Sequence, residues 1–149
     1  MIKSLRNSML AMMTLMAGLA QAQSPGSSAV QVKEPWVRGT VAQQKATGAF
    51  MQLSAPQDMR LVEARSPVAG VVELHEMAMD NNVMKMAAVP AIDLPVGKPV
   101  ALQPGGYHVM LMDLKAPLMK DSSVAVTLTF KDAKGVETKQ QVNLPVSLG

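Results

Sequence analysis

The chain has 149 residues and no cysteine, which excludes disulfides, thiolate zinc sites, cysteine nucleophiles and the blue-copper type of electron-transfer centre. The formal net charge is +3, but removing the N-terminal Lys3 and Arg6 from the 14 basic side chains leaves 12 against 11 acidic ones. A nearly neutral chain without a basic patch gives no reason to expect a nucleic acid or a membrane surface as partner.

The N-terminal segment, residues 1–22, has the pattern of a secretory signal peptide. Lys3 and Arg6 precede an apolar run over residues 8–20, which is followed by small residues typical of a cleavage site. The run is too short to span a bilayer comfortably, and no cysteine follows it to carry a lipid anchor. We therefore expect a periplasmic protein, free of the membrane after cleavage, whose mature part is residues 23–149 and forms one domain.

The remainder of the chain has the pattern of short strands separated by turns. Up to nine segments are rich in β-branched residues or alternate between apolar and polar side chains. They are residues 30–37, 48–53, 60–64, 71–79, 83–89, 100–102, 108–114, 124–131 and 136–144, with residues 90–98 read as a loop. No stretch has helical periodicity, so the sequence predicts an all-β sandwich or barrel.

The two segments at residues 71–79 and 83–89 are predicted to form a hairpin. Asn81 and Asn82 suit a two-residue type I′ turn, because asparagine tolerates positive φ. That turn places Met77 opposite Met86, with His75 on the same face and diagonal to Met86.

Both histidines of the chain lie among methionines, in the pattern H-x10-M-x21-H-x-M formed by His75, Met86, His108 and Met110. Imidazole and thioether are ligands that suit cuprous copper and are poorly matched to magnesium or calcium. Taken singly, methionines on a strand are more often gap-fillers in the core. The joint pattern favours a Cu(I) site over core packing, and it leaves open whether another nearby thioether replaces one of the four ligands. The candidates for such a replacement are Met77, Met79 and Met112.

The segments LHEMAMDNNVMKM and LQPGGYHVMLMDLK resemble the periplasmic copper A chaperone family (PCuAC, formerly DUF461). The resemblance implies a cupredoxin-like Greek-key β-sandwich or barrel that binds one Cu(I) through His75, Met86, His108 and Met110. We expect the domain to be a monomer. It also implies delivery of copper to the copper A centre of a respiratory haem–copper oxidase (cytochrome oxidase), with a Sco-type assembly factor as a second partner. Some members bind a second copper, as Cu(II), through a His- and Met-rich C-terminal tail, which this sequence lacks.

Four functions compete for this pattern. A copper chaperone is favoured, with copper buffering or tolerance as the alternative. An electron-transfer cupredoxin needs the absent thiolate. An enzyme is disfavoured, because both histidines are used and four protein ligands leave no open position for substrate. A structural module would use the methionines only for packing, and a measurement of Cu(I) affinity separates it from the others.

Overall fold

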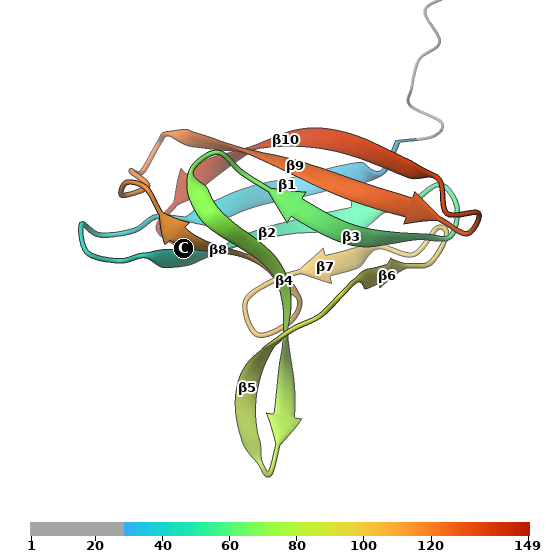
Figure 1. Cartoon of the computed structure of the whole chain (residues 1–149), viewed down its shortest axis with the longest axis horizontal. Helices are drawn as coiled ribbons and strands as arrows, with labels where there is room; N and C mark the ends of the chain where they lie inside the picture. The colour runs from blue at the N-terminus through green and yellow to red at the C-terminus, as the bar shows by residue number, and fades with distance from the viewer. Residues whose placement is uncertain (1–28) are drawn as a thin grey trace, which may run out of the picture.

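Ten strands form one open sheet that folds over itself into two layers in the computed structural model (Figure 1). The structure describes residues 29–149, so the predicted signal segment, residues 1–22, lies outside the described residues. The strands are β1 Gln31–Arg38, β2 Ala46–Ser54, β3 Met59–Arg65, β4 Ala69–Asp80, β5 Val83–Ala88, β6 Ile92–Leu94, β7 Val100–Leu102, β8 His108–Leu114, β9 Ser123–Asp132 and β10 Glu137–Ser147. Within residues 29–149 there is no helix of a length and apolarity that could cross a membrane.

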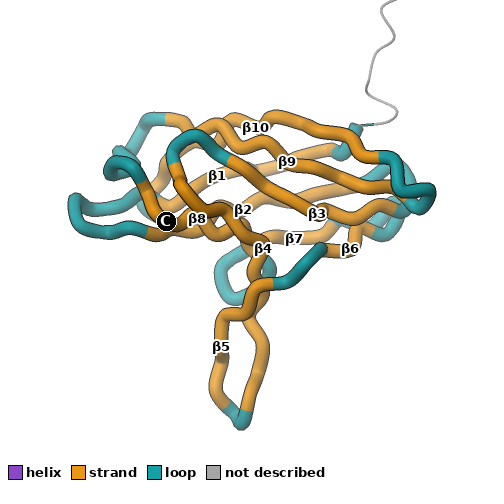
Figure 2. The backbone as a smooth tube through the Cα atoms, viewed as in Figure 1, coloured by secondary structure: helices purple, strands orange, loops and turns teal. Residues whose placement is uncertain are grey.

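The strand order explains the two layers. The sheet runs β5-β4-β8-β2-β1-β10-β9-β3-β6, with β7 also paired to β2. The parallel pairing of β1 with β10 joins the two layers. Figure 2 shows the two layers lying one above the other, with most of the loops at their two ends. Side chains from both layers meet in a core in which Leu111 of β8 and Phe130 of β9 are fully buried. The predicted all-β sandwich is confirmed.

The prediction of a loop over residues 90–98 is wrong. Residues 90–98 contain β6, which pairs with β3 at the edge of the sheet. Ile92 and Leu94 are buried, whereas Asp93 between them is exposed. The segment is only three residues long and lies between Pro90 and Pro95, so its alternation is too brief to outweigh the signal of the prolines.

The β4–β5 hairpin projects from the body of the molecule (Figure 1). Asn81 and Asn82 at its tip have φ values of 51° and 65°, as a type I′ turn requires. Met77 lies opposite Met86, as predicted. Every residue of β5 is exposed, so this strand extends into solvent and adds no side chain to the core.

The two faces of β4 and β8 have different roles. Leu74 of β4 and Val109 of β8 point into the core. Successive side chains of a strand point to opposite faces. The residues next to Leu74 on β4 and next to Val109 on β8 therefore lie on the outer face of the layer. Those residues include His75, His108 and Met110, so the candidate site lies on the outside of the sandwich, where the hairpin leaves it.

Candidate metal centre

The two histidines lie directly opposite each other on neighbouring strands. His75 of β4 pairs with His108 of β8, and their ring centroids are 5.6 Å apart. The sequence predicts that the histidines lie on two strands, but it does not predict that these strands are neighbours. The pairing of β4 with β8 joins segments that are far apart in the chain, and no local signal in the sequence contains it.

The histidine pair continues a row of rings across four adjacent strands. Phe50 of β2 lies 6.2 Å from His108, and Trp36 of β1 lies 4.7 Å from Phe50, measured between ring centroids. Gly48 leaves the space in which the Phe50 ring sits, since a Cβ atom at Gly48 would be 2.8 Å from that ring. The row holds His108 from one side, and the side chain of His108 is nearly fully buried.

Hydrogen bonds fix which nitrogen of each imidazole carries the proton. Nε2 of His75 is 2.8 Å from Oε2 of Glu73, and Nδ1 of His108 is 3.0 Å from the carbonyl oxygen of Gly106. A carboxylate or a carbonyl oxygen can only accept, so in the neutral rings these nitrogens are the N–H donors. The lone pairs are therefore on Nδ1 of His75 and Nε2 of His108.

Those two lone-pair nitrogens are buried and have no hydrogen-bond partner among residues 29–149. Buried polar atoms in proteins are nearly always paired, so two such atoms on facing rings call for an explanation. A metal ligand that donates its other ring N–H to a carboxylate or a carbonyl is the usual arrangement of a metal-binding histidine. Both imidazoles fit that arrangement.

Thioethers lie beside the ring of His108. Met86 of β5 and Met110 of β8 line a hollow of about 360 Å³ together with Met77 and His108. Met110 lies on the same face of β8 as His108, and Met86 lies opposite Met77 at the base of the hairpin. The structure thus brings three predicted site residues, Met86, His108 and Met110, to one hollow, and His75 adjoins it through the ring of His108.

The other methionines near the site are set further away. Met112 lies opposite Val71, two residues further along β8 than Met110, which lies opposite Glu73. Met79 pairs with Met84 nearer to the tip of the hairpin. Neither Met79 nor Met112 is among the residues that line the hollow.

The donor set limits which metal fits. Within residues 29–149, no group of three or more histidine, aspartate or glutamate side chains could hold an ion. A site here consequently needs the thioethers, and a mixed imidazole and thioether set matches cuprous copper.

A guanidinium group adds a positive charge to the rim of the hollow. Arg38 of β1 lines it, with its guanidinium carbon 5.7 Å from the ring centre of Trp36 and 5.6 Å from that of Phe50. These distances are those of cation–π contacts. A fixed positive charge beside the donors disfavours a divalent ion more than a monovalent one.

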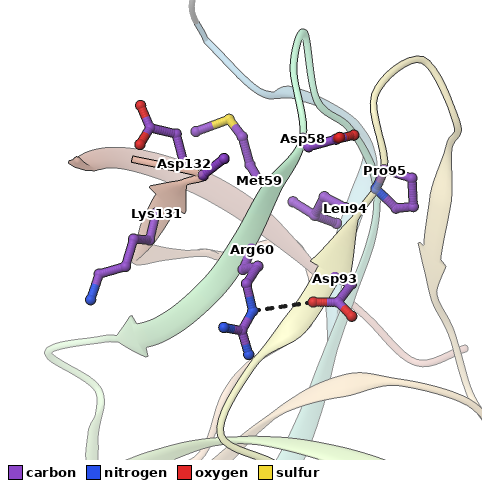
Figure 3. Close-up of a pocket in the computed structure, with 9 residues that line it drawn as sticks. Asp58, Met59, Arg60, Asp93, Leu94, Pro95, Lys131 and Asp132 are labelled. Atoms are coloured by element: carbon purple, nitrogen blue, oxygen red, sulfur yellow. Dashed lines mark hydrogen bonds and ion pairs between the residues drawn. The ribbon is translucent and has the colours of Figure 1, made fainter. Parts of the chain in front are cut away.

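A second hollow, of about 370 Å³, lies at the far edge of the molecule between β3 and β6 (Figure 3). Its charged groups are already engaged: Arg60 pairs with Asp93 at 3.2 Å, and Asp58 accepts a hydrogen bond from the amide of Val96. Arg60 and Asp93 are both well exposed. The hollow offers no unpaired buried donor, so it is a weaker candidate than the histidine pair.

A known protein family and two related proteins match the sequence of this chain. The sequence profile of the family described as putative lipoprotein LpqE-like matches residues 30–146. Putative lipoprotein Lxx21020 of Leifsonia xyli subsp. xyli is 36% identical over 116 residues, which cover 76% of this chain and 70% of that protein. The uncharacterised protein RP573 of Rickettsia prowazekii is 30% identical over 129 residues, which cover 83% and 69%.

Solved structures share the fold. The apo PCuAC domain from PmoF1 aligns with a TM-score of 0.64 at 21% identity, covering 80% of this chain and 94% of that domain. The solution structure of CuI-DR1885 from Deinococcus radiodurans aligns with a TM-score of 0.58 at 31% identity, covering 86% of each chain. The fold and the profile define a cupredoxin-like all-β domain of the PCuAC type. The chain belongs to the LpqE-like family, and the resemblance drawn from the sequence is confirmed.

Proposed function

We propose that this protein binds one Cu(I) ion through Nδ1 of His75, Nε2 of His108 and the thioether sulfurs of Met86 and Met110, and that it hands the ion to a recipient protein in the periplasm. The copper is a cargo rather than a resident cofactor. The function is that of a metallochaperone and not of an enzyme, because the proposed ligand set leaves no position for a substrate.

The observation that carries this proposal is the pair of buried imidazole nitrogens without partners. Each belongs to a ring whose other nitrogen is engaged, and the two ring centroids lie 5.6 Å apart beside a hollow lined with thioethers. The Deinococcus protein of similar fold was solved in a form named CuI-DR1885, which supports the same cargo for this chain.

The ligand chemistry supports transfer. None of the four ligands is a thiol, so the site has no group that would oxidise to a disulfide outside the cytoplasm. Met86 is 49% exposed, so a recipient can approach the copper from the side of the hairpin. A ligand that is both neutral and accessible suits exchange with a partner better than a closed thiolate site does.

Membership of the PCuAC type supports a specific recipient. We propose the apo copper A centre of a respiratory haem–copper oxidase, or a Sco-type assembly factor that acts beside it. Export through the predicted signal peptide would place the protein in the compartment where such a centre receives its copper.

The primary test is Cu(I) affinity measured by competition with a chromophoric chelator, followed by X-ray absorption of the loaded protein. We expect one tightly bound Cu(I) with two nitrogen and two sulfur neighbours. Affinity no greater than that of a His75→Ala, His108→Ala double variant would overturn the copper site, since this variant lacks both proposed imidazole ligands.

The recipient is tested separately. The Cu(I)-loaded domain should transfer its ion to the apo copper A domain or to the Sco-type factor, and deletion of the gene should lower oxidase activity under copper limitation. Tight copper binding without either effect would refute delivery and leave copper buffering or tolerance as the function.

A further inference from the structure

The hairpin carries a second pair of thioethers beyond the one at the candidate metal centre. Met77 pairs with Met86, and Met79 pairs with Met84 two residues nearer to the tip. Each such cross-strand pair is called a rung, and the pair of Met79 with Met84 is the outer rung. Positions two apart on a strand share a face, so all four methionines lie on the face that carries His75. The outer rung continues the thioether lining of the hollow away from the body of the molecule.

Core packing does not explain the outer rung. Met79 is 63% exposed and Met84 is 49% exposed, and β5 contributes no buried residue. Methionine is common in cores because its flexible side chain fills irregular gaps, but there is no core around this part of the hairpin. These two side chains need another reason to be thioethers.

The opposite face of the same hairpin is different in character. Ala78 lies opposite Lys85, and Nζ of Lys85 is 3.3 Å from a carboxylate oxygen of Asp80. The thioethers are therefore gathered on one face rather than scattered over the hairpin. The type I′ turn at Asn81 and Asn82 fixes this register.

We propose that Met79 and Met84 form a second and weaker Cu(I) site, through which the ion passes between the hairpin tip and the centre at His75 and His108. This inference rests on the proposed function, because the outer rung would pass Cu(I) to the inner site or receive it from there. Two thioethers offer fewer donors than the inner set, so the outer rung holds the ion more weakly, as a transit site requires.

The transfer is a ligand exchange along the strand. Neighbouring rungs on one face are about 7 Å apart, because each residue of a strand advances the chain by about 3.4 Å. Long thioether side chains on adjacent rungs can reach toward a shared ion, so one Cu–S bond forms as another breaks. Copper stays cuprous throughout, and no proton moves because a thioether carries none.

The first test follows the methionine methyl groups by NMR in protein labelled with [methyl-13C]methionine, titrated with Ag(I) as a redox-stable substitute for Cu(I). We expect the first equivalent to shift the signals of Met86 and Met110, and further equivalents to shift those of Met79 and Met84. Met119, which is 66% exposed and lies outside the strands, is the internal control. Shifts at Met79 and Met84 no larger than the shift at Met119 would overturn the outer site, whereas unshifted Met86 and Met110 signals would overturn the proposed function instead.

The second test is kinetic and uses the double variant Met79→Leu, Met84→Leu, with Met119→Leu as matched control. Leucine keeps the size and apolar character of methionine, and both positions are so exposed that the fold should tolerate the change. We expect the affinity for the first, tightly bound Cu(I) to be unchanged and the rate of transfer to a chelator to fall several-fold relative to the control. An unchanged rate would refute the transit route, and a large loss of equilibrium affinity would show that these residues are ligands of the inner site.

Discussion

Nε2 of His75 lies 2.8 Å from a carboxylate oxygen of Glu73, two residues earlier on the same face of β4. We therefore expect Glu73 to influence copper binding only through the ring of His75. By fixing the proton on Nε2, it leaves the lone pair on the buried Nδ1. The pattern of histidines and methionines in the sequence includes His75 but gives no role to its acidic neighbour.

Glu73→Val should weaken Cu(I) binding by about 10–100-fold, the usual cost of removing the partner of a metal-binding histidine. Glu73→Gln should lie between this variant and the wild type, because the amide oxygen still accepts the N–H. The matched control is Glu76→Val, since Glu76 points to the other face of β4. In the apo protein, 15N shifts of the His75 ring should report a loss of the Nε2–H tautomer in Glu73→Val alone. Equal losses of affinity in Glu73→Val and Glu76→Val would remove this role from Glu73.

Met110 and Met112 offer a matched pair on one face of β8. Met110 lines the hollow and Met112 does not. Leucine preserves size but removes the sulfur, so Met110→Leu should reduce Cu(I) affinity strongly and Met112→Leu should reduce it little, with a stability change below about 1.5 kcal/mol in each. Chelator competition and thermal unfolding measure the two effects. The ligand assignment would be wrong if Met112→Leu proved the more damaging variant.

Arg38 should influence which oxidation state of copper is bound. Replacing Arg38 by glutamine removes a positive charge from the rim of the hollow, which relieves repulsion more for Cu(II) than for Cu(I). We expect a lower Cu(II)/Cu(I) reduction potential and a narrower difference between the two affinities. Lys33→Gln is the control, since Lys33 is another cation of β1 that does not line the hollow. A potential that shifts equally in both variants would point to net charge rather than to position.

Gly48 should be sensitive to a single methyl group. A Cβ at this position would lie 2.8 Å from the ring of Phe50, so Gly48→Ala must displace that ring, which packs beside His108. We expect a loss of about 1–3 kcal/mol in the free energy of unfolding, as for other overpacked sites, together with weaker copper binding. Adding Phe50→Leu to Gly48→Ala should recover part of the stability. If Gly48→Ala is as stable as the wild type and the double variant less so, the ring is not constrained in this way.

Local patterns in the sequence were enough to predict the hairpin. The register of Met77 with Met86 follows from the Asn81-Asn82 turn and from two-residue periodicity, both of which depend on neighbours in the chain. The same local reasoning failed at β6, where three residues between prolines carry too little pattern.

The facing histidines could not be predicted in the same way. Their contact depends on β4 pairing with β8 across more than thirty residues of chain, and the sequence of either strand fits several partners equally well. Glu73 and His75 lie two residues apart on one strand, but the sequence does not show that the ring of His75 donates to this carboxylate. Arg38 lies still further from the motif in the chain and reaches the site only through the β1–β2 pairing.

The exposure of β5 has a consequence for the energetics of copper release. A segment with no buried side chain can separate from its neighbour at a small fraction of the free energy of global unfolding. Of the four proposed ligands, only Met86 belongs to this segment. Amide hydrogen exchange should therefore be fast in β5 and slow in β8, with copper slowing it in β5 most. Local opening of β5 would thus remove Met86 from the copper ion while the two imidazoles stay in place.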